Sequence, residues 1–224
     1  MKTDDKLSNY KAAKVLIPAF SYNLENDTRM LIPFLSKGLS NSDLIGFVNR
    51  EGVIVVKPTF SAYFGEFYSD KDQIKVAVID TYGFPRKSGG VSTYHRLAYG
   101  VINAQGSFVV KPDYLCLVPS IGGKTLFSVQ SKNYQYGVID EANNIVIPFG
   151  KYLWVDGFDH GLARVITNSE GGKKIGIINE NGAEVVPPIY DDIWNFYGKN
   201  RNSTRSIIGG TVKDMPLNGL RGLE

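Results

Sequence analysis

Short apolar segments alternate with polar turns along most of the chain, and one arrangement of them recurs. Each copy opens with a strand-like segment that has Gly at its second position, passes through a polar turn, and closes with a second apolar segment that ends in Pro and an aromatic residue. Full copies occupy residues 45–60, 99–114, 136–148 and 175–190, and residues 15–20 resemble half of another copy. A spacing of roughly 40 residues predicts a chain of similar supersecondary units.

The turn of each copy carries a residue that tolerates positive φ. Asn181-Gly182 predicts a two-residue type I′ turn, because Asn-Gly is the strongest short signal for that geometry. Gly52, Gly106 and Asn143 occupy the same place in the other copies. Polar side chains precede these turns and are expected to hydrogen-bond the turn backbone. They are Asn103, Asp140 and Asn179.

The Pro of each copy predicts the end of the second strand, since Pro has no N–H for a central ladder. The aromatic residue after it is expected to pack on a neighbouring unit. The opening glycines, such as Gly100 and Gly176, are expected to let neighbouring units approach closely. Residues 74–79 and 161–166 are further strand candidates, and no segment of ten or more residues keeps a clean helical period.

These elements predict an all-β fold of tandem β-hairpin repeats of about 40 residues each. A single hairpin is marginally stable in water, so each unit must pack on its neighbours. We favour an open or curved array, and a closed propeller-like ring is the alternative. Residues 1–14 form a lead-in, residues 15–197 the repeats, and residues 198–224 a basic C-terminal tail.

The repeats resemble the WG-repeat (KWG-repeat) family of bacterial β-rich repeat proteins. The resemblance rests on the hydrophobic-Gly opening, on Asp or Asn three residues after that Gly, on the turn residue and on the Pro-x-aromatic close. Residues 158–165 are similar to a further element of the family. Ile or Tyr stands where the family has Trp before Gly. The resemblance implies β-rich repeat units and no single biochemical activity.

The composition is that of an ordinary globular protein, with 43% hydrophobic and 21% charged residues. A net charge of +3 is too small to indicate a nucleic-acid partner. No stretch approaches the roughly 20 apolar residues of a membrane span. Residues 1–10 are polar and lack the apolar core of a signal peptide. We therefore expect a cytoplasmic protein, or an exported cell-envelope component if a signal peptide has been removed.

Sequence motifs for catalysis are weak. Residues 118–125 end like a phosphate-binding loop, but Val118 stands where that loop requires Gly, so a Gly-rich turn is expected. Cys116, His95 and His160 are too dispersed to suggest a metal site or a nucleophile pair. We predict no enzyme activity, no cofactor and no metal site.

The leading functional hypothesis is a non-catalytic repeat scaffold that binds a protein or peptide partner through its loops. The least regular segments, residues 64–68, 85–96 and 151–159, are the expected surface. Candidate aromatic anchors lie in or beside them, although packing between repeats would explain each equally well. They are Tyr82, Phe84, Tyr94, Tyr152 and Trp154. The alternative is a carbohydrate-binding or glycan-hydrolysing module that uses acids and aromatics near Trp154 and Trp194.

Overall fold

The structure is a computed structural model, and it describes residues 14–15, 31–37, 43–49, 51, 53–68, 73–196, 202–217 and 219–220. The regular structure of these residues is entirely β, which confirms the predicted fold class. None of them forms a helix of the length and apolarity that crossing a membrane requires. Most of the predicted half-copy, residues 16–20, lies outside the described residues.

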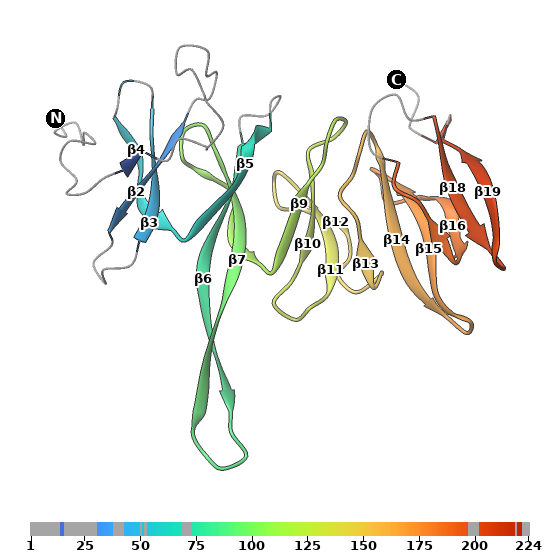
Figure 1. Cartoon of the computed structure of the whole chain (residues 1–224), viewed down its shortest axis with the longest axis horizontal. Helices are drawn as coiled ribbons and strands as arrows, with labels where there is room; N and C mark the ends of the chain where they lie inside the picture. Colours follow the sequence, from blue (N-terminus) through green and yellow to red (C-terminus); the bar gives the residue numbers. More distant parts are fainter. Residues whose placement is uncertain are drawn as a thin grey trace. The chain divides into compact units, whose positions relative to one another are not determined.

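The first of two compact units, residues 1–113, contains two four-stranded antiparallel sheets (Figure 1). The strands of the first sheet, in order, are β1 (Lys14–Val15), β2 (Ile32–Lys37), β3 (Asp43–Val48) and β4 (Ile54–Phe60). Those of the second are β5 (Ala62–Tyr68), β6 (Gln73–Pro85), β7 (Val91–Asn103) and β8 (Phe108–Tyr114).

The second unit, residues 114–224, contains three more antiparallel sheets. The first has β9 (Cys116–Pro119), β10 (Leu126–Gln130), β11 (Tyr136–Asp140) and β12 (Ile145–Ile147). The second has β13 (Trp154–Val155), β14 (Leu162–Ser169), β15 (Gly172–Asn179) and β16 (Glu184–Tyr190). The third has β17 (Asp192–Ile193), β18 (Ser203–Ile208) and β19 (Thr211–Pro216), so part of the predicted basic tail is a β hairpin.

The repeat copies correspond to the last two strands of each four-stranded sheet. Residues 45–60, 99–114, 136–148 and 175–190 fall on β3–β4, β7–β8, β11–β12 and β15–β16. The predicted strands at 74–79 and 161–166 belong to β6 and β14, each of which pairs with the first strand of a copy. No sheet formed by the described residues closes into a barrel, and within each unit the sheets form an open array in chain order.

The repeat turns are three-residue loops, and the predicted type I′ turn is wrong. Gly182 has φ 77°, whereas Asn181 has no positive φ. The N–H of Gly182 donates to the C=O of Asn179, and the N–H of Asn179 donates to the C=O of Ala183, both at 2.9 Å. This is a hairpin loop whose last residue forms a left-handed bulge. Gly106 and Asn143 occupy the same position in their copies.

The predicted role of the polar residue before each turn is confirmed. The side-chain oxygen of Asn179 accepts the backbone N–H groups of Asn181 and Ala183 at 3.0 and 3.1 Å. The equivalent oxygen in each of the other three copies likewise accepts two backbone N–H groups, two and four residues onward. The residues that supply it are Asn49, Asn103 and Asp140.

The repeat Pro marks a bulge, and it does not end the strand as predicted in three of the copies. Pro58, Pro112 and Pro188 lie inside β4, β8 and β16. An advance of two residues along β15, from Ile175 to Ile177, is matched by an advance of four along β16, from Tyr190 to Val186. The pairs Ile45–Phe60 and Phe47–Val56 repeat this shift between β3 and β4. Pro is tolerated there because the bulge lacks a regular ladder hydrogen bond.

In these three copies the opening Gly makes room for the bulge. A Cβ on Gly176 would lie 2.7 Å from the carbonyl oxygen of Val186 and 2.8 Å from the nitrogen of Pro188. Gly100 has the equivalent contacts in β8, at 2.6 and 2.7 Å. These glycines admit the second strand of their own hairpin, which corrects the expectation that they admit a neighbouring unit.

The hydrophobic cores lie between successive sheets of each unit. In the first unit, Phe47 of β3 and Val76 of β6 belong to one buried cluster. In the second unit, Val138 packs with Val165, and Ile177 packs with Met215 of the last sheet. Phe60, the aromatic residue that closes the first copy, packs edge-on against Phe108 of the next sheet with 6.1 Å between ring centroids. Its expected contact with a neighbouring repeat is confirmed.

Candidate functional site

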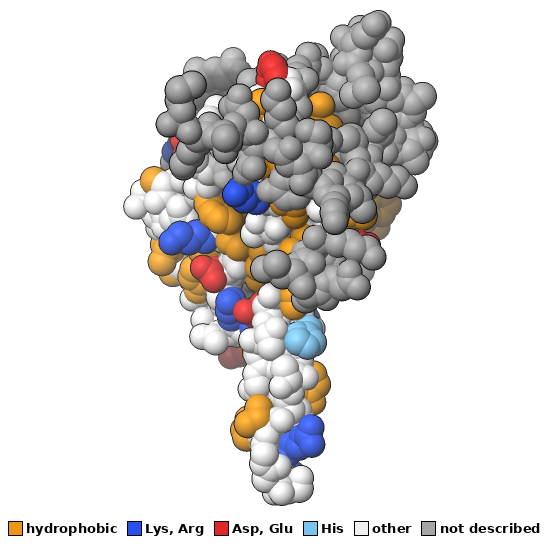
Figure 2. Space-filling view, turned by 90° about the vertical axis from the view of Figure 1, so that its left-hand side faces the viewer, with side chains coloured by type: hydrophobic (Ala, Val, Ile, Leu, Met, Phe, Trp, Pro, Cys, Tyr) orange, Lys and Arg blue, Asp and Glu red, His pale blue; other side chains and the backbone are white. Residues whose placement is uncertain are grey.

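The hairpin of β6 and β7 is much longer than its counterpart in the second unit. Both strands have 13 residues, whereas the equivalent β14 and β15 have eight each. The neighbouring strand β5 pairs with β6 only between Gln73 and Ala77. Residues 79–97, here called the arm, therefore extend past β5 as a two-stranded ribbon (Figure 1), and they form a narrow projection in the space-filling view (Figure 2).

The local sequence explains why the arm is a ribbon. β6 and β7 pair without a register shift as far as Pro85 and Val91, and the arm is rich in the β-branched and aromatic residues that favour strands. At the tip, the N–H of Arg86 donates to the C=O of Gly90 at 3.0 Å. Gly89 and Gly90 have φ of 87° and 82°, so two glycines allow the reversal.

Three aromatic rings share one face of the arm. Tyr82 lies opposite Tyr94 in the register, and their rings stack with centroids 5.7 Å apart. Phe84 is two residues along the same strand and meets both rings edge-on, at 6.3 and 6.5 Å. Phe84 is 61% exposed and Tyr94 49% exposed. The aromatic face, defined as Tyr82, Phe84 and Tyr94, thus presents ordered apolar surface to solvent.

Arginines flank the aromatic face along the ribbon. Toward the sheet, Nε of Arg96 lies 2.9 Å from Oδ2 of Asp80, and the guanidinium lies 4.3 Å from the ring centre of Tyr82. Toward the tip, Nε of Arg86 donates to Oγ of Ser92 at 2.6 Å. The contact between Arg96 and the Tyr82 ring is a cation–π interaction, and the ion pair with Asp80 supports it. The rings are therefore held by one another and by one of these arginines.

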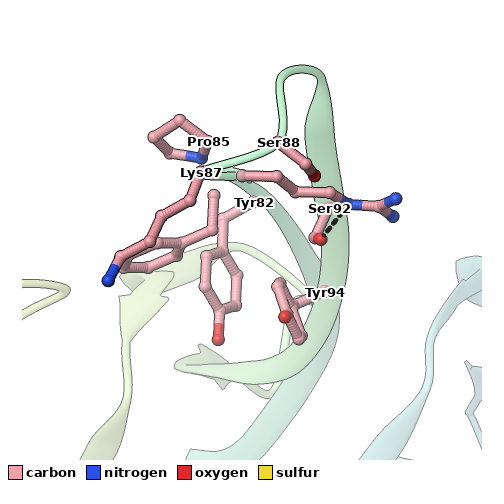
Figure 3. A pocket seen from close by; sticks show the side chains of 8 residues that line it. Tyr82, Pro85, Lys87, Ser88, Ser92 and Tyr94 are labelled. Atoms are coloured by element: carbon pink, nitrogen blue, oxygen red, sulfur yellow. Dashed lines mark hydrogen bonds between the residues drawn. The ribbon is translucent and has the colours of Figure 1, made fainter.

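The aromatic face and the tip together line a shallow hollow. In Figure 3 the rings of Tyr82 and Tyr94 lie side by side, with Lys87 and Ser92 nearer the turn, and the dashed line at Ser92 marks its hydrogen bond. The complete lining is Tyr82, Phe84, Pro85, Arg86, Lys87, Ser88, Ser92 and Tyr94.

The arm holds itself together. On its other face, the hydroxyl of Thr81 lies 3.0 Å from Nδ1 of His95, and the side chain of Val91 covers Gly83. The hydrogen bonds and ring contacts of residues 81–95 are all with other residues of the arm. The rest of the two sheets of this unit therefore gains no such bond from residues 81–95.

Two of the five predicted anchors lie elsewhere. Tyr152 is 3% exposed in a core of the second unit, and its hydroxyl donates to Oε1 of Glu184 at 2.8 Å. Burial, followed by this hydrogen bond, raises the pKa of Tyr152. Trp154 is half-buried in β13, with the guanidinium of Arg164 5.7 Å from its ring centre. The structure brings together Tyr82, Phe84 and Tyr94 in the first unit, and it places Tyr152 and Trp154 in the second.

Three of the acids near the tryptophans, Asp156, Asp159 and Asp191, have structural partners. Arg164 holds Asp156 with 2.8 Å between Nη2 and Oδ2. Asp159 is 1% exposed, and its carboxylate lies 2.7 Å from Nδ1 of His160. Lys174 and the N–H of Gly209 both donate to Asp191, and these bonds lower its pKa. These three acids therefore bond to neighbouring strands and loops.

Trp194 is the exposed ring of the last sheet. It is 46% exposed, and the guanidinium of Arg205 lies 5.1 Å from its ring centre. A hollow beside it has mostly polar walls. These are Asn195, Asn202, Ser203, Thr204, Arg205 and Asp214.

Two other motifs have plain structural places. Residues 120–125 connect β9 to β10, so the glycine-rich segment is the turn that its sequence predicts. Among the residues that the structure describes, no group of three or more His, Cys, Asp or Glu side chains gathers as a metal ion would require.

The sequence missed the extent of the arm. Residues 85–96 were predicted as an irregular loop, but only 86–90 turn, and 91–96 belong to β7. Residues 64–68 were also predicted as a loop and belong to β5. No sequence motif marks Arg86, Lys87 or Arg96. Alternating aromatic positions on both sides of Gly89-Gly90 were the available signal.

A family model described as the WG containing repeat matches residues 45–71, 136–170 and 175–200. The chain carries WG repeats. The matched segments include the copies at 45–60, 136–148 and 175–190, and they leave out the copy at 99–114 together with the arm. The arm is thus a lengthened hairpin between two matched segments of a WG-repeat chain. No curated protein matches the sequence.

Proposed function

We propose that this WG-repeat chain is a non-catalytic scaffold that binds a protein or peptide partner through the arm. The observation that carries the proposal is the aromatic face, whose Phe84 and Tyr94 rings are about half or more exposed. Exposed apolar patches on otherwise polar surfaces mark interaction sites, and aromatic residues dominate the energy of such interfaces. The repeats supply a frame on which a single hairpin can be lengthened.

The arm is also well ordered before any partner arrives. Tyr82 is in contact with Tyr94, Phe84 and Arg96, so little side-chain freedom remains to be lost on binding. Preorganisation of this kind increases affinity because it lowers the entropic cost of association. Residues 81–95 form their hydrogen bonds and ring contacts within the arm. These contacts therefore order the arm and do not stabilise the rest of the sheets.

The proposal is tested by selection from a random 12-residue peptide library displayed on phage, with the full chain as bait. The test variant carries Tyr82→Ala, Phe84→Ala and Tyr94→Ala. The control variant removes apolar side chains of similar exposure with Ile145→Ala, Ile189→Ala and Val212→Ala. We expect to select peptides that bind both the unchanged chain and the control variant. These peptides should not bind the test variant. Enrichment that is the same on all three proteins would refute the proposal.

Trp194 favours carbohydrate binding as a second candidate. Its exposed ring lies beside amide, hydroxyl and carboxylate groups, which together resemble the stacking and hydrogen-bonding surfaces that sugars need. A glycan array probed with the chain and with Trp194→Ala would show ring-dependent binding. Binding to no glycan, or equal binding by both proteins, would rule this candidate out. We do not extend it to hydrolysis, because Asp156 and Asp191 are held in ion pairs.

A further inference from the structure

We infer that the occupant of the arm is an acidic, extended peptide segment. Its carboxylates pair with Arg86 and Lys87 at the tip, and its apolar side chains pack on the aromatic face. This inference rests on the proposed function and adds the chemistry of the partner.

The charges of the arm indicate an acidic partner. Residues 79–97 contain three cations, Arg86, Lys87 and Arg96, and one carboxylate, Asp80. Asp80 is bonded to Arg96 at the end of the arm nearest the sheet. The tip therefore keeps its positive charge, and Arg86 and Lys87 are both exposed. No acid of the arm lies at the tip to compensate this charge, so a partner at the aromatic face lies beside two cations.

The hydrogen bond of Arg86 prepares it to receive a carboxylate. Its Nε donates to the neutral hydroxyl of Ser92, which fixes the side chain beside the aromatic face. Arginine presents its donors in a planar fork, so the terminal Nη groups can still grip a carboxylate in a paired arrangement. Lys87 adds a compact charge on the same turn. An acidic residue next to an apolar one would therefore satisfy both parts of the site.

The shape of the site favours an extended chain. The flanking arginines and the aromatic face lie in one line along the ribbon, from Arg96 past Tyr82 and Phe84 to the tip. A peptide in β conformation places every second side chain on the same side, which matches a linear row of contacts.

A single-stranded nucleic acid is the other polyanion to weigh, and the rings favour the peptide. Bases bind aromatic side chains by stacking on open ring faces. The Tyr82 ring already contacts Tyr94 and the guanidinium of Arg96. Phe84 meets Tyr94 edge-on, at an interplanar angle of 88°, so the rings do not form a parallel stacking ladder. Interlocked rings of this kind suit apolar side chains better than flat bases.

The experiment uses the peptides selected on the full chain, and the charge of the selected pool is the first readout. We expect an excess of Asp and Glu over the starting library. The strongest peptide is then synthesised with a fluorescein label, and its binding is followed by fluorescence anisotropy. For Arg86→Glu with Lys87→Glu we expect about a tenfold loss of affinity, from two lost pairs at a partly desolvated surface.

The control carries Lys111→Glu and Lys173→Glu, which change the net charge by the same amount at two exposed lysines that are not part of the arm. This variant should bind as the unchanged chain does. Added salt should weaken binding to the unchanged chain, because exposed charge pairs are screened. Equal losses in both charge variants would overturn the inference, since overall charge would then explain the effect.

The remaining outcomes separate this inference from the function on which it rests. Selected peptides that need the aromatic face and are neutral or basic would overturn the acidic partner and leave the proposed function intact. Peptides that ignore the aromatic face would overturn both. A labelled oligothymidylate of 12 nucleotides serves as the competing probe. Arm-dependent binding of this probe that is tighter than that of the best peptide would overturn the choice of a peptide.

Discussion

Gly176 occupies a position where one methyl group would meet backbone atoms. Its Cβ would collide with the carbonyl of Val186 and with Pro188, and neither can move without changing the bulge of β16. We expect Gly176→Ala to lower the free energy of unfolding by about 1–3 kcal/mol, as overpacking commonly does. Urea denaturation measures this change. Gly171→Ala is the matched control, because a Cβ there meets no atom within 4 Å. Equal stability of the two variants would contradict the close approach.

Asp140 gives the repeat turn a pH dependence that the other copies lack. The side chain and backbone N–H of Asn144, and the N–H of Ala142, lower the pKa of its carboxyl below the ordinary value for Asp. Its contribution to stability is therefore complete above the unfolded-state pKa, near 3.9, and is lost as pH falls through the lower folded-state pKa. A carbon-13 NMR titration should show Asp140 titrating below ordinary Asp residues. A midpoint at or above the ordinary value would contradict these bonds.

At this scale the sequence predicted chemistry better than geometry. The oxygens of Asn103, Asp140 and Asn179 were expected to bond the turn, and they do. The type I′ turn expected at Asn181-Gly182 was wrong, because the oxygen of Asn179 collects two backbone N–H groups in a longer loop. The preference of Asn-Gly for a two-residue turn carries no information about the side chain of Asn179.

The hairpin is the element that the repeat preserves, and its turn can be tested separately from its strands. Asn179→Ala removes the acceptor of two backbone hydrogen bonds, so we expect a loss of about 1 kcal/mol or more in the free energy of unfolding. Asn179→Asp should be nearly neutral at pH 7, because Asp140 forms the same two bonds in its own copy. Thermal melting compares the stabilities of the Ala and Asp variants. If the Asp variant is as unstable as the Ala variant, the side-chain oxygen is not what stabilises the turn.

Strand pairing within each repeat was predictable, and strand ends were not. The paired apolar segments became β3–β4, β7–β8, β11–β12 and β15–β16 as expected. Pro58 and Pro188 do not end their strands, because the glycine opposite leaves room for a bulge that needs no N–H. Residues 91–96 read as a loop because Ser92, Thr93 and His95 are polar. In a ribbon exposed on both faces, polarity does not distinguish a strand from a loop.

For the whole molecule, the repeat pattern was sufficient to predict WG repeats and an all-β fold. The function that we propose depends on a departure from that pattern, the lengthened hairpin between Pro58 and Pro112. Three of its aromatic residues were selected from the sequence, and their convergence on one face needed the register of β6 and β7. Tyr152 was indistinguishable from them in the sequence, because its burial arises from the packing of two successive sheets and not from its local sequence.

Excision of the arm tests the central claim most directly. Residues 81–95 are replaced by Asn-Gly, which joins the paired residues Asp80 and Arg96 in a tight hairpin. Titration calorimetry then measures binding of the peptide selected on the full chain, and thermal melting checks the fold. We expect no detectable binding and a melting temperature within about 4 °C of the full chain. Retained binding, or collapse of the fold, would contradict an arm that binds a partner and supports no other part of the molecule.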